Sequence, residues 1–228
     1  MPAPAVRLAA LLAFLAIPAF ADAVTAADAG QHAPSPIDDF QRTAAERAGI
    51  LEGTDYTRLG TCQGLVRDLY RWGVLDNLAT GIAFGLINNT TTIARRAEAI
   101  GNHRLQRGSA EFVIGFCTAT VHVHLANRDG AKNLPAVVVP SHVIGPVLQS
   151  RVARLQSPDA FDPDRCRAHI RELEGAEVID EVAAVMLLSE LDDAIEQGTF
   201  GTRSQDSGQG FGHGLCAVVL NALMGAPG

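Results

Sequence analysis

Residues 112–125, FVIGFCTATVHVHL, decide what kind of fold this chain adopts. From Cys117 onward, apolar or small residues alternate with two threonines and then with His122 and His124. Because neighbouring side chains of a strand point to opposite faces, this period of two predicts a strand with one polar face. The run is longer than most strands, so a buried helix over 111–125 is the alternative.

The residues that follow predict a partner for this strand. Residues 127–130, NRDG, are typical of a turn, and the apolar run 137–139, VVV, lies between Pro135 and Pro140. Proline beside a short apolar run favours a strand at the edge of a sheet. The two segments together predict a small β-hairpin.

The remainder of the chain shows the three- and four-residue apolar spacing of helices. Predicted helices cover about 35–51, 62–72, 77–87, 146–155, 163–173, 177–197 and 213–224. The cluster NNTTT at 88–92 is expected to interrupt the third helix, because these side chains compete for backbone hydrogen bonds. No internal repeat stands out. The predicted fold is mainly α, a single domain over 37–226 with a small β-hairpin, stapled by two disulfides.

The first residues have the pattern of an export signal. Arg7 precedes an apolar run over 8–17, and the triplet AFA at 19–21 is a suitable cleavage site. The apolar run is too short to cross a membrane, so residues 1–21 are predicted to be a signal peptide. Residues 22–36 are rich in Ala and Pro and are predicted to be a flexible leader. The expected location is periplasmic or secreted, with no membrane span after cleavage.

Charge narrows the class of partner. The chain has 18 Lys and Arg against 25 Asp and Glu, which leaves a net charge of −7. Nucleic acids and anionic membranes bind clustered basic residues, so neither is expected as a partner. No cofactor motif is recognised. The expected partner is an unidentified protein or small-molecule ligand in the cell envelope.

The cysteines predict covalent cross-links. The chain has four of them: Cys62, Cys117, Cys166 and Cys216. An even number of cysteines in an exported protein predicts two disulfides. Three pairings are possible, and the sequence leaves the choice open.

Cys62 opens the run CQGLV at the start of a predicted helix. This run resembles the nucleophile segment of the bacterial cell-wall cysteine peptidases of the papain-like clan. The resemblance implies that Cys62 is a nucleophile, that a helix N-terminus lowers the pKa of its thiol, and that His122 is the base. It implies hydrolysis of cell-wall peptide. The alternative is that Cys62 is half of a disulfide on the buried side of its helix.

Two histidines suggest a further alternative. His122 and His124 would lie on the same side of the predicted strand and could share a metal ion, with His142 or His103 as a third ligand. The simpler interpretation is that they continue a solvated polar face. Since no acid and base residues converge in the sequence, we favour an exported accessory protein of the cell envelope that binds rather than catalyses.

Overall fold

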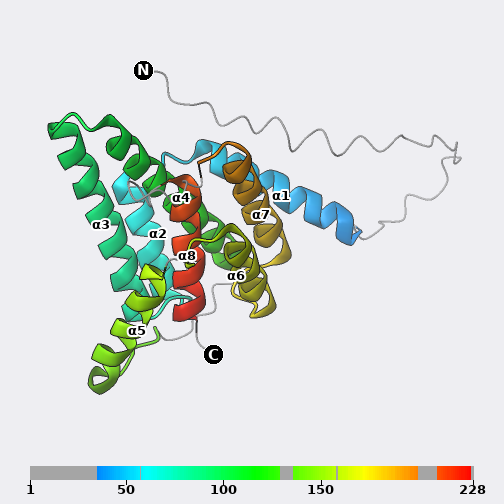
Figure 1. The fold of residues 1–228 in the computed structure, drawn as a ribbon. Coiled ribbons are helices and arrows are strands. Elements are labelled where there is room, and N and C mark those ends of the chain that lie inside the picture. Colours follow the sequence, from blue (N-terminus) through cyan, green and yellow to red (C-terminus); the bar gives the residue numbers. More distant parts are fainter. Residues whose placement is uncertain (1–34, 57, 129–135, 158, 200–209, 227–228) are drawn as a thin grey trace, which may run out of the picture. The chain divides into compact units, whose positions relative to one another are not determined.

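Helices make up the described part of the chain, and no strand occurs there (Figure 1). The computed structural model describes residues 35–56, 58–128, 136–157, 159–199 and 210–226. The predicted signal peptide, and the predicted leader up to residue 34, lie outside the described residues. The elements are α1 (Pro36–Gly53), α2 (Leu59–Arg71), α3 (Asn77–Ala99), α4 (His103–Arg128), the 3₁₀ turn η3 (Ser141–Val143), α5 (Ile144–Gln156), α6 (Pro163–Gly175), α7 (Glu181–Glu196) and α8 (Phe211–Gly225).

The predicted strand over 112–125 is wrong, because this segment lies inside α4. Every residue from Phe116 to Val123 is buried. A helix that is covered on all sides has no polar stripe, so its sequence lacks the period of 3.6 that identifies an amphipathic helix. The hydroxyl of Thr120 donates to the carbonyl oxygen of Phe116 at 2.8 Å, which allows a buried threonine inside the helix. The alternative of a buried helix is confirmed.

The predicted return strand is also wrong. Val137 and Val139 belong to a segment without regular structure that is hydrogen-bonded to the first residue of α3. The carbonyl oxygen of Val137 accepts a hydrogen bond from the backbone of Asn77 at 3.2 Å. The side-chain oxygen of Asn77 accepts one from the backbone of Val139 at 2.9 Å. These bonds take the place of a strand partner, so the described residues contain no β-hairpin.

The predicted interruption of α3 at 88–92 is wrong as well. The hydroxyls of Thr91 and Thr92 donate to the carbonyl oxygens of Ile87 and Asn88, both at 2.8 Å. These polar side chains therefore bond back to the preceding turn and leave the helix continuous. The predicted helices over 35–51, 62–72, 146–155, 163–173 and 213–224 correspond to α1, α2, α5, α6 and α8.

Helix α4 has the longest apolar stretch among the described helices. By length and composition alone it could cross a membrane, and α8 is a shorter apolar helix. However, 67% of the most apolar stretch of α4 is buried inside the helical unit. A buried core helix passes the same test, so this feature is explained by the packing of α4 against α3 and α8.

The chain contains an internal repeat that the sequence patterns above did not reveal: α1–α4 correspond to α5–α8. From α1 to the start of α3, each residue and its equivalent in the second half lie 104 positions apart, as in Arg47 and Arg151 (151 − 47 = 104). The same spacing relates Cys62 to Cys166 and Asp76 to Asp180. Helices α2 and α6 begin and end at equivalent positions. Helices α3 and α7 begin at equivalent positions as well. Because α7 is shorter than α3, the spacing falls to 99 in α4 and α8 (216 − 117 = 99).

The two halves meet where α4 packs against α8 (Figure 1). A Cβ added to Gly115 would overlap the backbone carbonyl of Phe211, and a Cβ added to Gly214 would overlap that of Phe112. Gly115 is equivalent to Gly214, and Phe112 is equivalent to Phe211. Each half therefore presents the same surface to the other, which is the mark of an approximate two-fold relation.

The prediction of two disulfides is confirmed, and the pairing is now known. Cys62 of α2 is bonded to Cys117 of α4, with 5.3 Å between their Cα atoms. Cys166 of α6 is bonded to Cys216 of α8, with 5.4 Å between theirs. The two bonds join equivalent helices of the two halves. Disulfides persist in oxidising compartments, so the pairs favour a location outside the cytosol.

Candidate functional site

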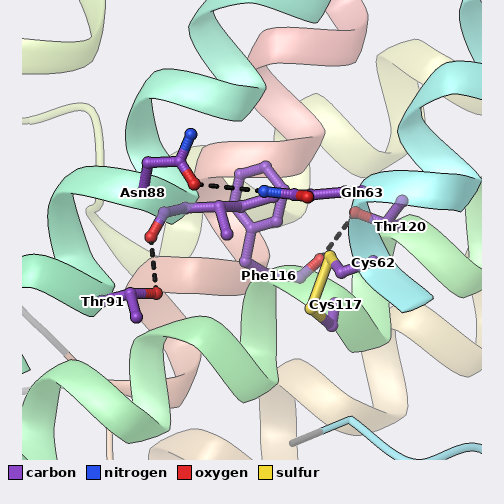
Figure 2. Close-up of a disulfide and its surroundings, with 8 residues drawn as sticks. Cys62, Gln63, Asn88, Thr91, Phe116, Cys117 and Thr120 are labelled. Carbon is purple, nitrogen blue, oxygen red and sulfur yellow. Dashed lines mark hydrogen bonds between the residues drawn. A yellow bond between two sulfur atoms is a disulfide. The ribbon is translucent and has the colours of Figure 1, made fainter. Parts of the chain in front are cut away.

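The sulfur of Cys62 is bonded to that of Cys117, as Figure 2 shows. Both residues are buried at the contact between α2 and α4. Next to the disulfide, the amide of Gln63 donates to the side-chain oxygen of Asn88 at 3.1 Å. In this state Cys62 has no thiol to ionise, so the nucleophile hypothesis would first require reduction of the bond.

His122 is fully buried in α4. Neither ring nitrogen has a hydrogen-bond partner among the described residues. Burial and the nearby charge of Arg47 lower the pKa of His122 to about 3. His122 stands five residues after Cys117, which turns its direction by about 140° around the helix. The side chain therefore points away from the Cys62–Cys117 bond and would be a weak base.

The three proposed metal ligands do not share one location. His124 is two helical positions from His122, so the two rings point to nearly opposite sides of α4. The ring of His124 lies 4.5 Å from that of Trp72, and its Nε2 lies 3.7 Å from a carboxylate oxygen of Asp68. His142 is exposed in η3. Within the described ranges, no three His, Cys, Asp or Glu side chains form a group that could hold a metal ion.

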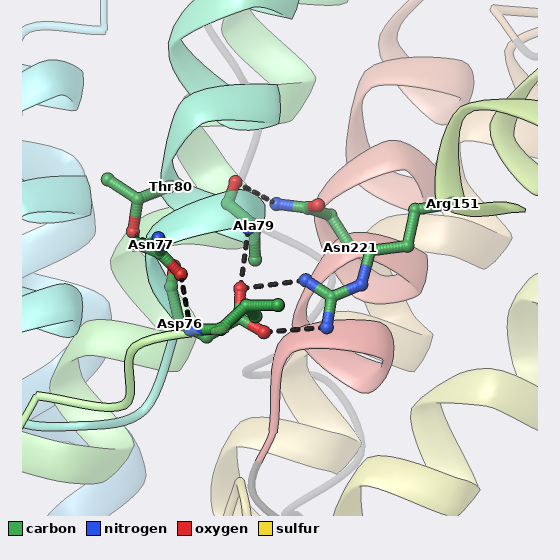
Figure 3. A network of polar contacts seen from close by, with 7 residues as sticks. Asp76, Asn77, Ala79, Thr80, Arg151 and Asn221 are labelled. Carbon is green, nitrogen blue, oxygen red and sulfur yellow. Dashed lines mark hydrogen bonds and ion pairs between the residues drawn. The ribbon is translucent and has the colours of Figure 1, made fainter. Parts of the chain in front are cut away.

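A carboxylate at the start of α3 holds the outer helix α5 (Figure 3). One oxygen of Asp76 accepts from the backbone of Ala79 at 2.7 Å and so caps α3. Both oxygens accept from the guanidinium of Arg151, at 2.7 and 2.6 Å. The side chains of Asp76 and Arg151 are 5% and 13% exposed, so this ion pair is largely buried.

The other half of the chain repeats this arrangement for α1. Asp180 caps α7 by accepting from the backbone of Ala183 at 2.9 Å. It accepts two bonds from Arg47 of α1, at 2.6 and 2.5 Å. Burial raises the pKa of Asp180, but the bonds from Arg47 and Ala183 outweigh it and hold the pKa below its ordinary value. Each outer helix is thus tied to the opposite half by an arginine.

Near these ion pairs, the two halves carry different buried polar residues at one equivalent position. Asn221 of α8 is buried, and its amide donates to the carbonyl oxygen of Ala79 at 2.9 Å (Figure 3). The equivalent position in α4 is His122 (221 − 122 = 99), whose ring nitrogens have no such bond among the described residues. One half therefore places an amide that donates through its nitrogen where the other places a neutral imidazole.

A shallow groove of about 350 Å³ runs along α5 beside the end of α8. It is lined by Pro146, Val147, Ser150, Arg151, Arg154 and Met224. Arg151 is committed to Asp76, whereas Arg154 is exposed. The sequence patterns did not mark any of these residues as a candidate site residue, although Pro146 and Met224 bound two predicted helices. A signal was present for Arg151 alone, because an arginine stands 15 residues before a cysteine in both halves (62 − 47 = 166 − 151 = 15).

Comparisons with protein-family models, curated proteins and solved structures find no match for this chain. The groove, the disulfides and the relation between the two halves are the features of the described residues that bear on its function.

Proposed function

We propose that the protein is an exported accessory protein of the cell envelope, periplasmic or secreted, that binds its partner rather than converting it. The observation that carries this proposal is that all four cysteines of the chain are paired. The pairs favour an oxidising compartment. The predicted signal peptide points to the same location.

The repeat supports a structural role for Cys62. Its equivalent in the second half, Cys166, is bonded to Cys216 in the same way that Cys62 is bonded to Cys117. A nucleophile would need surroundings that its equivalent lacks. The same pair of helices is instead joined at the same positions in both halves, which is expected of a cross-link that stabilises the fold.

The surroundings of His122 support the same conclusion. A general base works best when its pKa lies near the operating pH, and the pKa of His122 is lowered to about 3. No partner for its ring nitrogens occurs among the described residues. The groove on α5, in contrast, is open to solvent and offers exposed polar and apolar side chains to a ligand.

Hydrolysis assays on the oxidised and the reduced protein test this proposal. Cell-wall peptide is the substrate, and the variants Cys62→Ala and Cys166→Ala are compared. We expect no hydrolysis by any form and a similar loss of thermal stability in both variants. Hydrolysis that requires reductant and disappears in Cys62→Ala, but persists in Cys166→Ala, would refute the binding role.

A further inference from the structure

We propose that the groove between α5 and α8 binds a small carboxylate with an apolar body. In this assignment Arg154 and Ser150 hold the carboxylate, and Val147, Pro146 and Met224 contact the apolar part. The inference rests on the proposed binding function and names the ligand class for it.

The internal repeat separates the groove residues that the fold needs from those that it does not. Arg151 has an equivalent, Arg47, which forms the same kind of ion pair with Asp180, the aspartate that caps α7. The positions of Ser150 and Arg154 are occupied in the first half by Glu46 and Ile50 (150 − 46 = 154 − 50 = 104). The same architecture therefore forms without a hydroxyl and a guanidinium at these positions.

Charge at the groove favours an anion. The sequence contains no Asp or Glu from residue 130 to residue 158, although the whole chain has a net charge of −7. The carboxylate of Asp76 is already bonded to Arg151. Arg154 is exposed, and within the described part of the chain the structure records no ion pair for it. Its guanidinium can therefore offer hydrogen bonds to an incoming anion.

The side chains of α5 have the spacing that a single ligand requires. Ser150 and Arg154 are four residues apart, so they lie on the same face of the helix. Val147 lies on that face one turn earlier. A guanidinium and a hydroxyl side by side match the two oxygens of a carboxylate, and bonds from a charged donor are the stronger kind.

Size limits the ligand to a small molecule. The groove has a volume of about 350 Å³. The distance along the helix from Val147 to Arg154 is about 10 Å, at 1.5 Å per residue. Pro146 and Val147 precede Arg154 by about two turns of α5, and Met224 of α8 adds a further apolar contact to the groove. A medium-chain carboxylate has these dimensions, and octanoate is a suitable probe.

The test is an NMR titration of the purified oxidised protein with octanoate, octanamide and inorganic phosphate. We expect octanoate to shift the backbone signals of residues 147–154 and Met224 in a saturable manner. Octanamide, which has the same chain without the charge, should bind at least tenfold more weakly. Arg154→Gln should weaken octanoate binding at least tenfold, since a charge-assisted bond contributes about that much.

Arg96→Gln is the matched control, because Arg96 is an exposed arginine in the last turn of α3 and does not line the groove. It should leave octanoate binding unchanged. Equal binding of octanoate and octanamide, an unchanged affinity in Arg154→Gln, or no saturable shift in the groove would overturn the inference. Phosphate that binds as tightly as octanoate would also overturn it, because the apolar body would then contribute nothing.

The two proposals fail in different experiments. Absence of octanoate binding refutes the ligand class and leaves the hydrolysis assays unaffected. Hydrolysis that depends on Cys62 refutes the binding role even if octanoate occupies the groove.

Discussion

Gly115 and Gly214 each lie against the backbone of the helix that carries the other. No side chain separates α4 from α8 at these two points, so the helix backbones approach closely. The contact is reciprocal and relates equivalent residues of the two halves. It explains why glycines occur in the middle of two buried helices, where glycine otherwise disfavours helix formation.

Gly115→Ala is expected to lower the free energy of unfolding by about 3 kcal/mol, because the new methyl group overlaps the carbonyl of Phe211. Gly85→Ala is the control: Gly85 is exposed in α3, and nothing lies within 4 Å of an added Cβ. There alanine should raise the free energy of unfolding by about 0.5–1 kcal/mol. Urea unfolding measures both changes. Effects of the same sign would contradict the close contact.

Asp76→Asn is expected to cost more than Asp180→Asn. Asparagine still caps a helix, so each variant chiefly removes an ion pair. The Asp76–Arg151 pair is nearly buried, and loss of one partner should cost about 3–5 kcal/mol. Asp180 is 44% exposed while its partner Arg47 is 9% exposed, so its loss should cost less, about 2 kcal/mol. Thermal and urea unfolding compare the two. Equal costs would mean that burial does not decide the strength of these pairs.

Acid should destabilise the protein through His122. Its pKa is lowered from 6.5 to about 3 in the folded protein. Below pH 6.5 the unfolded chain binds a proton at this position and the folded chain does not, so stability falls as the pH decreases toward 3. The loss attributable to His122 should reach about 3 kcal/mol at pH 4.

His122→Asn is the matched variant, because asparagine occupies the equivalent position in α8. The difference in unfolding free energy between wild type and His122→Asn, measured from pH 8 to pH 4, isolates the contribution of His122. That difference should shift in favour of the variant as the pH falls. A pH-independent difference would show that His122 ionises normally in the folded state.

The sequence predicted α6 well because its signals are local. Asp162 and Pro163 mark the start of the helix, and Cys166, Ile170 and Leu173 form one buried stripe. For α4 the same reasoning failed, because burial on all sides removes the stripe. The alternation of threonines and histidines in α4 does not mark a solvated face, because the hydroxyl of Thr120 is buried and bonds to a carbonyl oxygen of the same helix.

The internal repeat is hard to recognise in the sequence, because few equivalent positions of the two halves carry the same residue. Arginine, cysteine and aspartate recur at fixed spacing, while neighbours such as Gln63 and Arg167 differ. Residues shared by both halves stabilise the fold, and residues that differ are free to take other roles. The groove could not be predicted from local patterns, since Arg154 and Met224 come together only when α5 packs against α8.

The central claim is that the four cysteines form two equivalent cross-links and leave no reactive thiol. Peptide mapping of the native, unreduced protein after alkylation tests it most directly. We predict no alkylated cysteine, with fragments linking Cys62 to Cys117 and Cys166 to Cys216. An alkylated Cys62, or a fragment linking Cys62 to Cys166, would contradict the account.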